Sequence, residues 1–282
     1  MITLSSDFGW PYPAAMKGVI LQRTDARLVD ITHEFPRQDV RASAFWLREV
    51  LPYFPPAVHL VVVDPGVGTD RAALVVRAGG HALVGPDNGV LLPVARELDA
   101  RADPGDDSSS ASTGADRFEV FRVAERSAEE GPPAPGSDWP PAPASSTFHG
   151  RDVFAPAAGR VHRIGIDALQ GDPGFERVES FENLEFPAAT PRVDGATGEV
   201  LVVDGFGNAI TNVPGRVVRE RRGTDISVNG ERVPVCDTYA RRNPGEGLVT
   251  VGSHGNVELA VNRGRGAELF GVDAGDPVRL AW

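Results

Sequence analysis

The first half of the chain alternates short apolar runs with amphipathic stretches. Runs rich in β-branched residues and bounded by turn-forming positions predict buried strands, and the longer amphipathic stretches predict helices. This alternation indicates an α/β domain with a largely parallel sheet. The predicted strands cover residues 2–4, 27–31, 60–63, 72–76, 82–84 and 118–123, and the predicted helices cover residues 14–22, 39–51 and 154–163.

The pattern changes after about residue 198. Short β-rich runs now follow one another, separated only by turns, which is typical of a small all-β barrel or sandwich. We therefore expect an N-terminal α/β domain over residues 1–186 and a smaller, all-β, barrel-like C-terminal domain over residues 193–282, joined near residues 186–196. The β-rich runs are EVLVVD, NAITNV, DISVNG, ERVPVC, GLVTVGS, NVELAVN and PVRLAW.

Residues 101–146 interrupt the first domain. The stretches DPGDDSSSASTGAD and EEGPPAPGSDWPPAPASS are rich in proline, serine, glycine and acidic residues. Such segments cannot bury enough apolar surface to offset the entropy of ordering. We expect a flexible insert on the surface.

Composition and charge narrow the class of protein. Hydrophobic residues make up 41% of the chain and charged residues 24%, as in an ordinary globular protein. The net charge of −11 argues against nucleic-acid partners and anionic membrane surfaces, which require basic patches. Cys236 is the only cysteine, which excludes an internal disulfide and fits a reducing compartment. With no signal-peptide pattern and no run near the ~20 apolar residues of a membrane span, we expect a cytoplasmic protein with no membrane partner.

The stretch HLVVVDPGVGTDRAALVV carries the first candidate site. Asp64 lies at the carboxyl end of a predicted strand, where open α/β sheets place their ligands. Arg71 follows seven residues later, across a glycine-rich turn, and can fold back onto that carboxylate. The alternative is a salt bridge that only braces the turn.

Two further residues in the first domain have candidate roles. Asp7 also ends a predicted strand and can accept hydrogen bonds from both hydroxyls of a ribose, although it can equally cap the next helix. His149, within STFHGRDVF, can transfer a proton or orient a ligand, or it is an ordinary loop histidine. In the second domain, Asn208 beside Phe206 can recognise a purine, although asparagine is also common in β-turns.

Taken in order, six segments of the chain resemble the S-adenosylmethionine hydrolases, also called S-adenosylmethionine hydroxide adenosyltransferases. These enzymes are relatives of the fluorinases and chlorinases. The resemblance covers almost the whole chain apart from residues 101–146. The six segments are SDFG, DPGVGTDR, GPDNG, STFHGRD, DGFGNAITN and GSHGNVELAVNRG.

The resemblance implies a fold, a partner and a reaction. It implies a homotrimer, with the small-molecule substrate between the N-terminal domain of one subunit and the C-terminal domain of its neighbour. S-adenosyl-L-methionine is then the substrate rather than a cofactor, and it reacts with water to give adenosine and L-methionine. Asp64, Arg71 and His149 match the set that surrounds the nucleophilic water. The halogenating relatives have an uncharged residue at the aspartate position and lack the histidine, so water is the expected nucleophile.

The resemblance also implies substrate contacts. In the family pattern, Asp7 binds the ribose hydroxyls, and residues of the second domain make the other substrate contacts. The leaving group is a neutral thioether, so we expect no metal and no further cofactor, and the chain has no metal-type Cys/His spacing. The short segment 10–14 has no acid where the family usually has one for the methionine amine, which leaves the amine to Asp204 or Glu258. The implied contacts are Phe206, Asn208 and the backbone near Asn262 and Arg263 for adenine, Ser253, His254 and Glu258 for the methionine end, and Asp204 for its ammonium.

Three other functions compete with hydrolysis. A halogenase is disfavoured because a carboxylate at position 64 repels halide. A non-catalytic adenosine or S-adenosylmethionine binding protein needs Asp7 and Asn208 but not the catalytic set. A generic nucleotide-binding domain is disfavoured because the chain has no G-x-G-x-x-G after a strand and no Walker-type motif.

Overall fold

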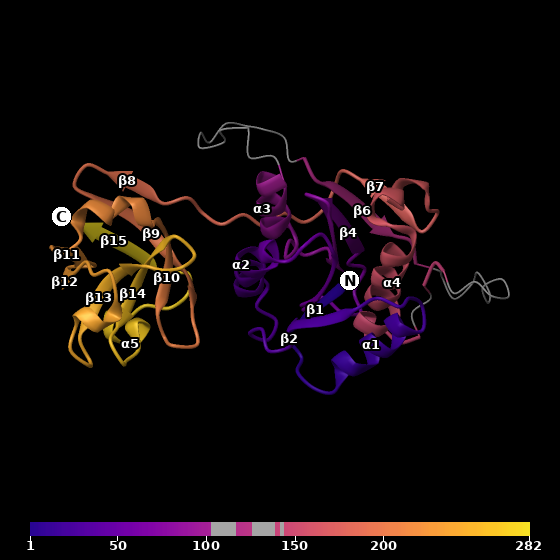
Figure 1. The fold of residues 1–282 in the computed structure, drawn as a ribbon, viewed down its shortest axis with the longest axis horizontal. Coiled ribbons are helices and arrows are strands. Elements are labelled where there is room, and N and C mark those ends of the chain that lie inside the picture. The colour runs from indigo at the N-terminus through magenta and orange to yellow at the C-terminus, as the bar shows by residue number, and fades with distance from the viewer. Residues whose placement is uncertain (103–116, 126–138, 142–143) are drawn as a thin grey trace. The chain divides into compact units, whose positions relative to one another are not determined.

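The structure, a computed structural model, describes residues 1–102, 117–125, 139–141 and 144–282 (Figure 1). The described chain divides into two compact units, Met1–Glu185 and Phe186–Trp282. Each unit has a hydrophobic core of its own. Most of the predicted flexible insert, residues 101–146, lies outside the described residues.

The N-terminal unit is built on a seven-stranded sheet in its described part. The strands are β1 (Ile2–Ser6), β2 (Leu28–Thr32), β3 (Val58–Val62), β4 (Ala73–Ala78), β5 (His81–Pro86), β6 (Glu119–Val123) and β7 (Phe175–Val178). Their order is β2-β1-β3-β5-β4-β6-β7. The first four in this order pair in parallel, and the remaining pairs are antiparallel.

The sheet is therefore mixed, and the prediction of a largely parallel sheet is correct for only one half of it. The strand direction first reverses at β4, because the turn at Gly79 and Gly80 joins β4 directly to β5. Both glycines have positive φ angles, 53° and 82°, and Ala78 pairs with His81 across the turn. A two-residue hairpin forces its strands to be antiparallel, whereas a parallel pair needs a long crossover.

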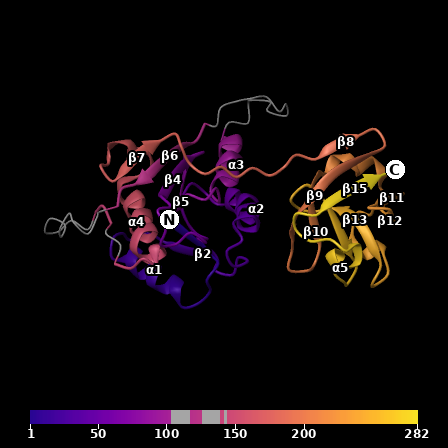
Figure 2. The same cartoon turned by 180° about the vertical axis from the view of Figure 1, so that it is seen from behind.

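Helices cover both faces of this sheet. They are α1 (Tyr12–Leu21), α2 (Val40–Val50), α3 (Leu92–Ala102) and α4 (Ala155–Ile164). Helix α1 packs with α4, and α2 packs with α3 on the other side of the sheet (Figure 1, Figure 2). The Asp39 side chain accepts a hydrogen bond from the Ala42 amide at 2.9 Å, so α2 begins where the sequence predicts.

The C-terminal unit is an antiparallel, barrel-like sheet, as predicted. Its strands are β8 (Thr190–Arg192), β9 (Gly195–Val203), β10 (Ala209–Pro214), β11 (Asp225–Val228), β12 (Glu231–Pro234), β13 (Gly247–Val251), β14 (Asn256–Val261) and β15 (Pro277–Ala281). The order is β12-β11-β15-β9-β10-β14-β13, with β8 paired to β9. Val235, just past β12, bridges to Val249 of β13, so the two ends of the sheet meet. A short helix, α5 (Gly266–Phe270), follows β14.

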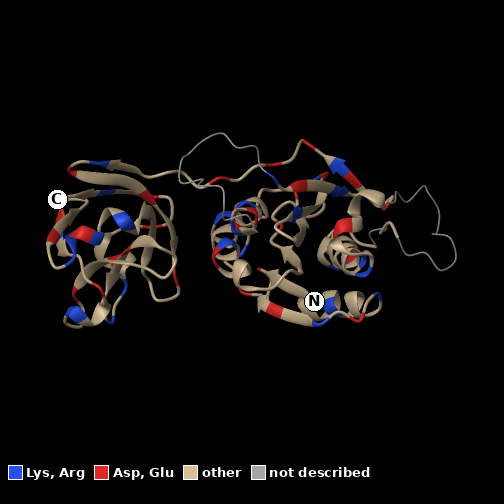
Figure 3. Cartoon of the chain, turned by 45° about the horizontal axis from the view of Figure 1, so that its top comes forward, with Lys and Arg blue, Asp and Glu red and all other residues tan. Residues whose placement is uncertain are grey.

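Charged residues of both signs are interspersed along the ribbons of both units (Figure 3). Several pair within their own unit, as Arg222 does with Asp237 at 2.8 Å. No helix among the described residues is long and apolar enough to cross a membrane.

Candidate active site

Asp64 and Arg71 form an ion pair across the turn that follows β3. Arg71 Nη2 donates a hydrogen bond to Asp64 Oδ2, and the Gly66 amide donates to Asp64 Oδ1 at 3.2 Å. The two side chains are only 5% and 8% exposed, for Asp64 and Arg71 respectively. Arg71 Nη1 donates to the Ala72 carbonyl at 2.7 Å, which fixes the guanidinium at the start of β4. This geometry holds a carboxylate and a cation together out of bulk solvent.

His149 reaches this pair because glycines let distant segments approach. Gly68 has a φ of +82°, and a Cβ there would lie 2.7 Å from the Ser146 carbonyl oxygen. A Cβ on Gly150 would lie 3.0 Å from Met16 Sδ and 3.1 Å from the Phe148 ring. Gly68 therefore lets the turn after β3 approach the segment before α4, and Gly150 lets that segment pack against Met16 of α1.

Arg71 joins the carboxylate to the imidazole. Its Nη2 lies 3.3 Å from His149 Nδ1, and its guanidinium carbon lies 5.0 Å from the centre of the Phe154 ring. Phe154 ends a short π-helical turn, Gly150–Phe154, that leads into α4. Because arginine only donates hydrogen bonds, His149 Nδ1 accepts one, and the imidazole proton is on Nε2 in the neutral ring. The structure thus brings Asp64, Arg71 and His149 together.

The environment of Asp64 favours proton uptake. Burial raises the pKa of the Asp64 carboxyl above its ordinary value, and the nearby Arg71 guanidinium opposes but does not cancel that rise. A carboxylate with a raised pKa is a stronger base than one in water. This is the adjustment that general-base catalysis near neutral pH requires.

A cavity of about 730 Å³ opens beside the same residues. Arg71 and His149 both line it, together with Asp70, Asp87 and Glu182. Arg71 and His149 therefore border a solvent-connected space, whereas Asp64 lies behind Arg71 and does not line it.

Asp7 occupies a neighbouring strand end but makes a different contact. It follows β1, and its Oδ2 accepts a hydrogen bond from the Gln38 amide at 2.6 Å. No side-chain hydrogen bond caps α1, so Asp7 does not have the helix-capping role that the sequence left open. The Gln38 contact ties the loop before α2 to the end of β1.

In the C-terminal unit, the turn between β9 and β10 holds three of the predicted residues. Asp204 Oδ1 accepts from the Phe206 and Asn208 amides at 2.9 Å each, and its Oδ2 accepts from Asn208 Nδ2 at 3.0 Å. Asn208 is buried, whereas Phe206 is 82% exposed. The predicted β-turn chemistry is present, and it displays an aromatic ring at the surface.

A second polar group lies on β14 and the turn before it. His254 Nε2 lies 3.6 Å from Glu258 Oε2, and both side chains are buried. Tyr239 Oη donates to Glu258 Oε1 at 2.5 Å. Burial, reinforced by Glu258 and Asp204, raises the pKa of Tyr239, so its hydroxyl stays protonated and donates. Sequence reasoning missed Tyr239, because it lies in a short turn that carries no motif.

The remaining predicted residues lie near these groups without direct side-chain contacts to them. Asn262 Nδ2 donates to the Arg242 carbonyl at 2.7 Å, and Arg263 and Ser253 are exposed. The Ala267 amide donates to the Gly207 carbonyl at 2.8 Å. The segment after Arg263 therefore packs against the turn that carries Asn208.

Other polar features of the two units lie outside these groups. His59 Nε2 and His81 Nδ1 form a buried hydrogen bond of 2.8 Å. Burial lowers the pKa of His59 to about 3 and also lowers the pKa of His81, so both rings are neutral structural groups.

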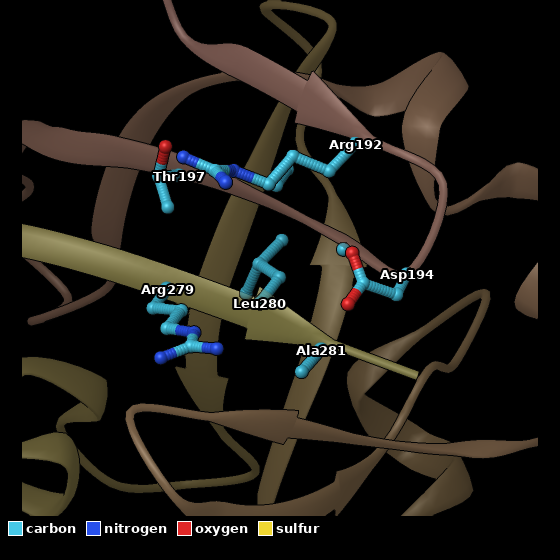
Figure 4. A pocket seen from close by; sticks show the side chains of 8 residues that line it. Arg192, Asp194, Thr197, Arg279, Leu280 and Ala281 are labelled. Atoms are coloured by element: carbon cyan, nitrogen blue, oxygen red, sulfur yellow. The ribbon is translucent and has the colours of Figure 1, made fainter.

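A hollow of about 230 Å³ in the C-terminal unit lies over β8, β9 and β15, lined by Arg192, Asp194 and Arg279 (Figure 4). It contains none of the predicted site residues. No group of three or more metal-ligating side chains occurs in the described parts of the chain.

Comparisons with known proteins cover nearly the whole chain. Residues 2–169 match the SAM hydroxide adenosyltransferase N-terminal domain, and residues 198–279 match the corresponding C-terminal domain. The (R)-S-adenosyl-L-methionine hydrolase of Salinispora tropica is 39% identical, over 99% of this chain and 97% of that protein. The enzyme of the same name from Thermus thermophilus is 41% identical, over 98% and 97% respectively. A crystal structure of an uncharacterized conserved protein from Thermotoga maritima is 30% identical with a TM-score of 0.78, covering 100% of both chains.

Proposed function

The chain belongs to the SAM hydroxide adenosyltransferase family, and from this premise we propose that it hydrolyses S-adenosyl-L-methionine to adenosine and L-methionine. One observation carries the proposal to this chain's own residues. Arg71 contacts both the Asp64 carboxylate and the His149 imidazole, beside an open cavity. A buried acid and an imidazole joined by one fixed cation suit the activation of one water molecule.

The reaction places few demands on the site. The water oxygen forms a bond to the 5′ carbon while the bond from that carbon to sulfur breaks, and its electron pair goes to sulfur. The sulfonium thus leaves as a neutral thioether, and one proton is released. Such a leaving group needs no acid and no Lewis-acidic metal, so the remaining task is to orient and deprotonate the water. Dialysis against a chelator should leave the rate unchanged.

We assign a different role to each member of the set, and the contacts support that assignment. Asp64 has raised proton affinity and unused lone pairs, so it accepts the proton of the attacking water. Arg71 orients that carboxylate and neutralises it before the proton arrives. His149 accepts from Arg71 through Nδ1, so its Nε2–H is the group that donates to the water oxygen.

Substrate recognition follows the polar groups of both units. We assign Asp7 to the ribose hydroxyls, and Phe206 and Asn208 to adenine by stacking and hydrogen bonding. The exposure of the Phe206 ring and the rigid Asp204 turn support this assignment. The backbone near Asn262 and Arg263 borders the adenine, Ser253, His254 and Glu258 meet the methionine end, and Asp204 meets its ammonium.

We further propose that the enzyme is a cytoplasmic homotrimer. Residues 1–186 of one subunit would supply the catalytic set, and residues 193–282 of a neighbouring subunit would supply the adenine and methionine contacts. The division of the polar groups between two units supports this arrangement. A single cysteine is consistent with a reducing compartment. Light scattering should give three times the 30.0 kDa mass of the chain.

Product analysis tests the reaction directly. Purified protein is incubated with S-adenosyl-L-methionine in chloride buffer, with a parallel sample in oxygen-18 water. Adenosine labelled at its 5′ oxygen, together with free methionine, is expected. Chlorodeoxyadenosine would instead indicate a halogenase, and tight adenosine binding without turnover would indicate a binding protein.

A further inference from the structure

Two large aromatic side chains are exposed at the start of α1, Trp10 just before the helix and Tyr12 as its first residue. Trp10 is 80% exposed and Tyr12 is 54% exposed. Rings of this size usually bury most of their surface, so two exposed rings within three residues mark a surface that contacts something.

The start of α1 packs against the residue that precedes His149. The Tyr12 ring packs edge-on against Phe148 at 5.4 Å and against Phe8 at 6.0 Å, and Phe8 and Phe148 also meet at 6.1 Å. Phe148 immediately precedes His149. The three-ring cluster of Phe8, Tyr12 and Phe148 therefore adjoins the residue that we assign to the attacking water.

One ring of this cluster already accepts a cation. The Arg151 guanidinium carbon lies 5.3 Å from the centre of the Phe148 ring. Within the described chain, no such cation lies over Tyr12 or Trp10 among the cation–ring contacts of the N-terminal unit. These two rings remain available for a cation supplied by a ligand.

The reaction places a cation within reach of these rings. In-line attack begins with the water oxygen roughly 3–3.5 Å from the 5′ carbon, and the sulfur is bonded to the opposite side of that carbon. The sulfonium is therefore about 5 Å from the attacking oxygen, adding roughly one carbon–sulfur bond to that approach distance. Because Phe148 is the residue before His149, a water held by His149 places the sulfonium in the neighbourhood of the three-ring cluster.

We propose that Tyr12 and Trp10 form an aromatic wall that binds the sulfonium of S-adenosyl-L-methionine through cation–π contacts. The proposal rests on the proposed function, because it takes the substrate from it. It gives the enzyme a means to prefer the charged substrate over its neutral thioether counterpart, which carries the same adenosine and the same amino-acid tail.

The kinetic consequence follows from the loss of charge. The sulfur becomes neutral as the bond to carbon breaks, so a cation–π contact stabilises the bound substrate more than the transition state. Removing the wall should raise KM by up to about ten-fold and raise kcat by a smaller factor, because the transition state keeps part of the positive charge.

Binding measurements test the wall without turnover. Calorimetry compares S-adenosylhomocysteine, which is neutral at sulfur, with the nitrogen analogue of S-adenosylmethionine in its protonated form, and uses adenosine as a third ligand. The native protein should prefer the cationic analogue to the neutral one by about ten-fold. The double variant Trp10→Leu with Tyr12→Leu should lose this preference, and Tyr12→Phe should keep it. Tyr53→Leu, which removes another exposed ring of the same unit, is the matched control.

The other outcomes overturn the proposal. A native protein that binds both analogues equally has no cation-binding wall. A double variant that retains the preference shows that other groups recognise the cation. Equal weakening of all three ligands, adenosine included, would show that the start of α1 supports the fold or a subunit contact instead. A protein that keeps the preference but releases no adenosine from the substrate would contradict the proposed function and leave the wall supported.

Discussion

The polar groups of the two units differ in how their carboxylates are compensated. In the N-terminal unit, Asp64 is held by a guanidinium that also contacts an imidazole. In the C-terminal unit, Asp204 is held by amides, whereas Glu258 accepts from a tyrosine hydroxyl and lies 3.6 Å from the His254 imidazole. Among the described residues, neither of these two acids forms an ion pair with an arginine or lysine.

This difference suggests that the N-terminal group carries out the reaction and that the C-terminal group binds the substrate. A carboxylate whose charge is neutralised by a neighbour can accept a proton from water without first attracting a cation from the ligand. A carboxylate with no arginine or lysine beside it attracts a positive group, such as the ammonium of an amino acid. We infer that the N-terminal group controls kcat and the C-terminal group controls affinity.

Replacing Asp64 tests the first half of the comparison and should give the largest effect. Asp64→Asn keeps the shape of the side chain but removes its proton affinity. We expect kcat to fall by about 10³-fold, the usual contribution of a general base, with little change in affinity for S-adenosylhomocysteine. Initial rates and calorimetry measure the two quantities. A loss of affinity as large as the loss of rate would contradict the catalytic role.

Replacing Glu258 tests the second half. Glu258→Gln keeps an acceptor for Tyr239 but removes a buried negative charge. We expect KM to rise about thirty-fold, as for the loss of one charged hydrogen bond, with kcat nearly unchanged. Adenosine affinity, measured by calorimetry, is the internal control, because adenosine has no ammonium. Weaker adenosine binding of the same size would show that Glu258 serves the fold of β14 rather than the methionine end.

The pH dependence sharpens the account of the N-terminal group. Because burial raises the pKa of Asp64, the base loses activity by protonation at a higher pH than an ordinary aspartate does. The acid limb of the pH–kcat profile should therefore lie above pH 3.8, with about ten-fold lost per unit below it. Arg71→Gln removes the charge that opposes the rise and should move the limb to higher pH, whereas Arg71→Lys should move it less. A limb that stays at the same pH in both variants would exclude Asp64 as the titrating base.

The fold was predictable where local pattern decides it. The strand before Asp64 and the Asp39 cap of α2 both follow from short-range signals that the structure matches. The orientation of β4 did not follow from the alternation of apolar runs, because apolar periodicity does not distinguish a parallel from an antiparallel strand. The Gly79–Gly80 pair carried that information as a hairpin signal.

The sequence predicted which residues form the site better than it predicted the contacts between them. Asp64 and Arg71 are close in sequence, so their pairing follows from one turn. The approach of His149 depends on Gly68 and Gly150, whose role appears only when the packed segments are seen. Tyr239 donates a hydrogen bond to Glu258, which lies 19 positions later in the chain, and no local sequence pattern indicates this contact.

Phe206 gives the smallest expected effect and tests whether the C-terminal group binds the nucleoside as well as the amino acid. Its ring is 82% exposed, so Phe206→Leu removes an aromatic face without opening a cavity in the core. Stacking of one ring on a base contributes roughly 1 kcal/mol, so adenosine affinity should fall about five-fold and kcat should not change. Leu269→Ala, at another exposed apolar side chain of the same unit, is the control for loss of surface hydrophobicity. Unchanged adenosine affinity in Phe206→Leu would mean that the C-terminal unit recognises only the methionine end of the substrate. The N-terminal unit would then carry out the chemistry, and the C-terminal unit would bind only the amine.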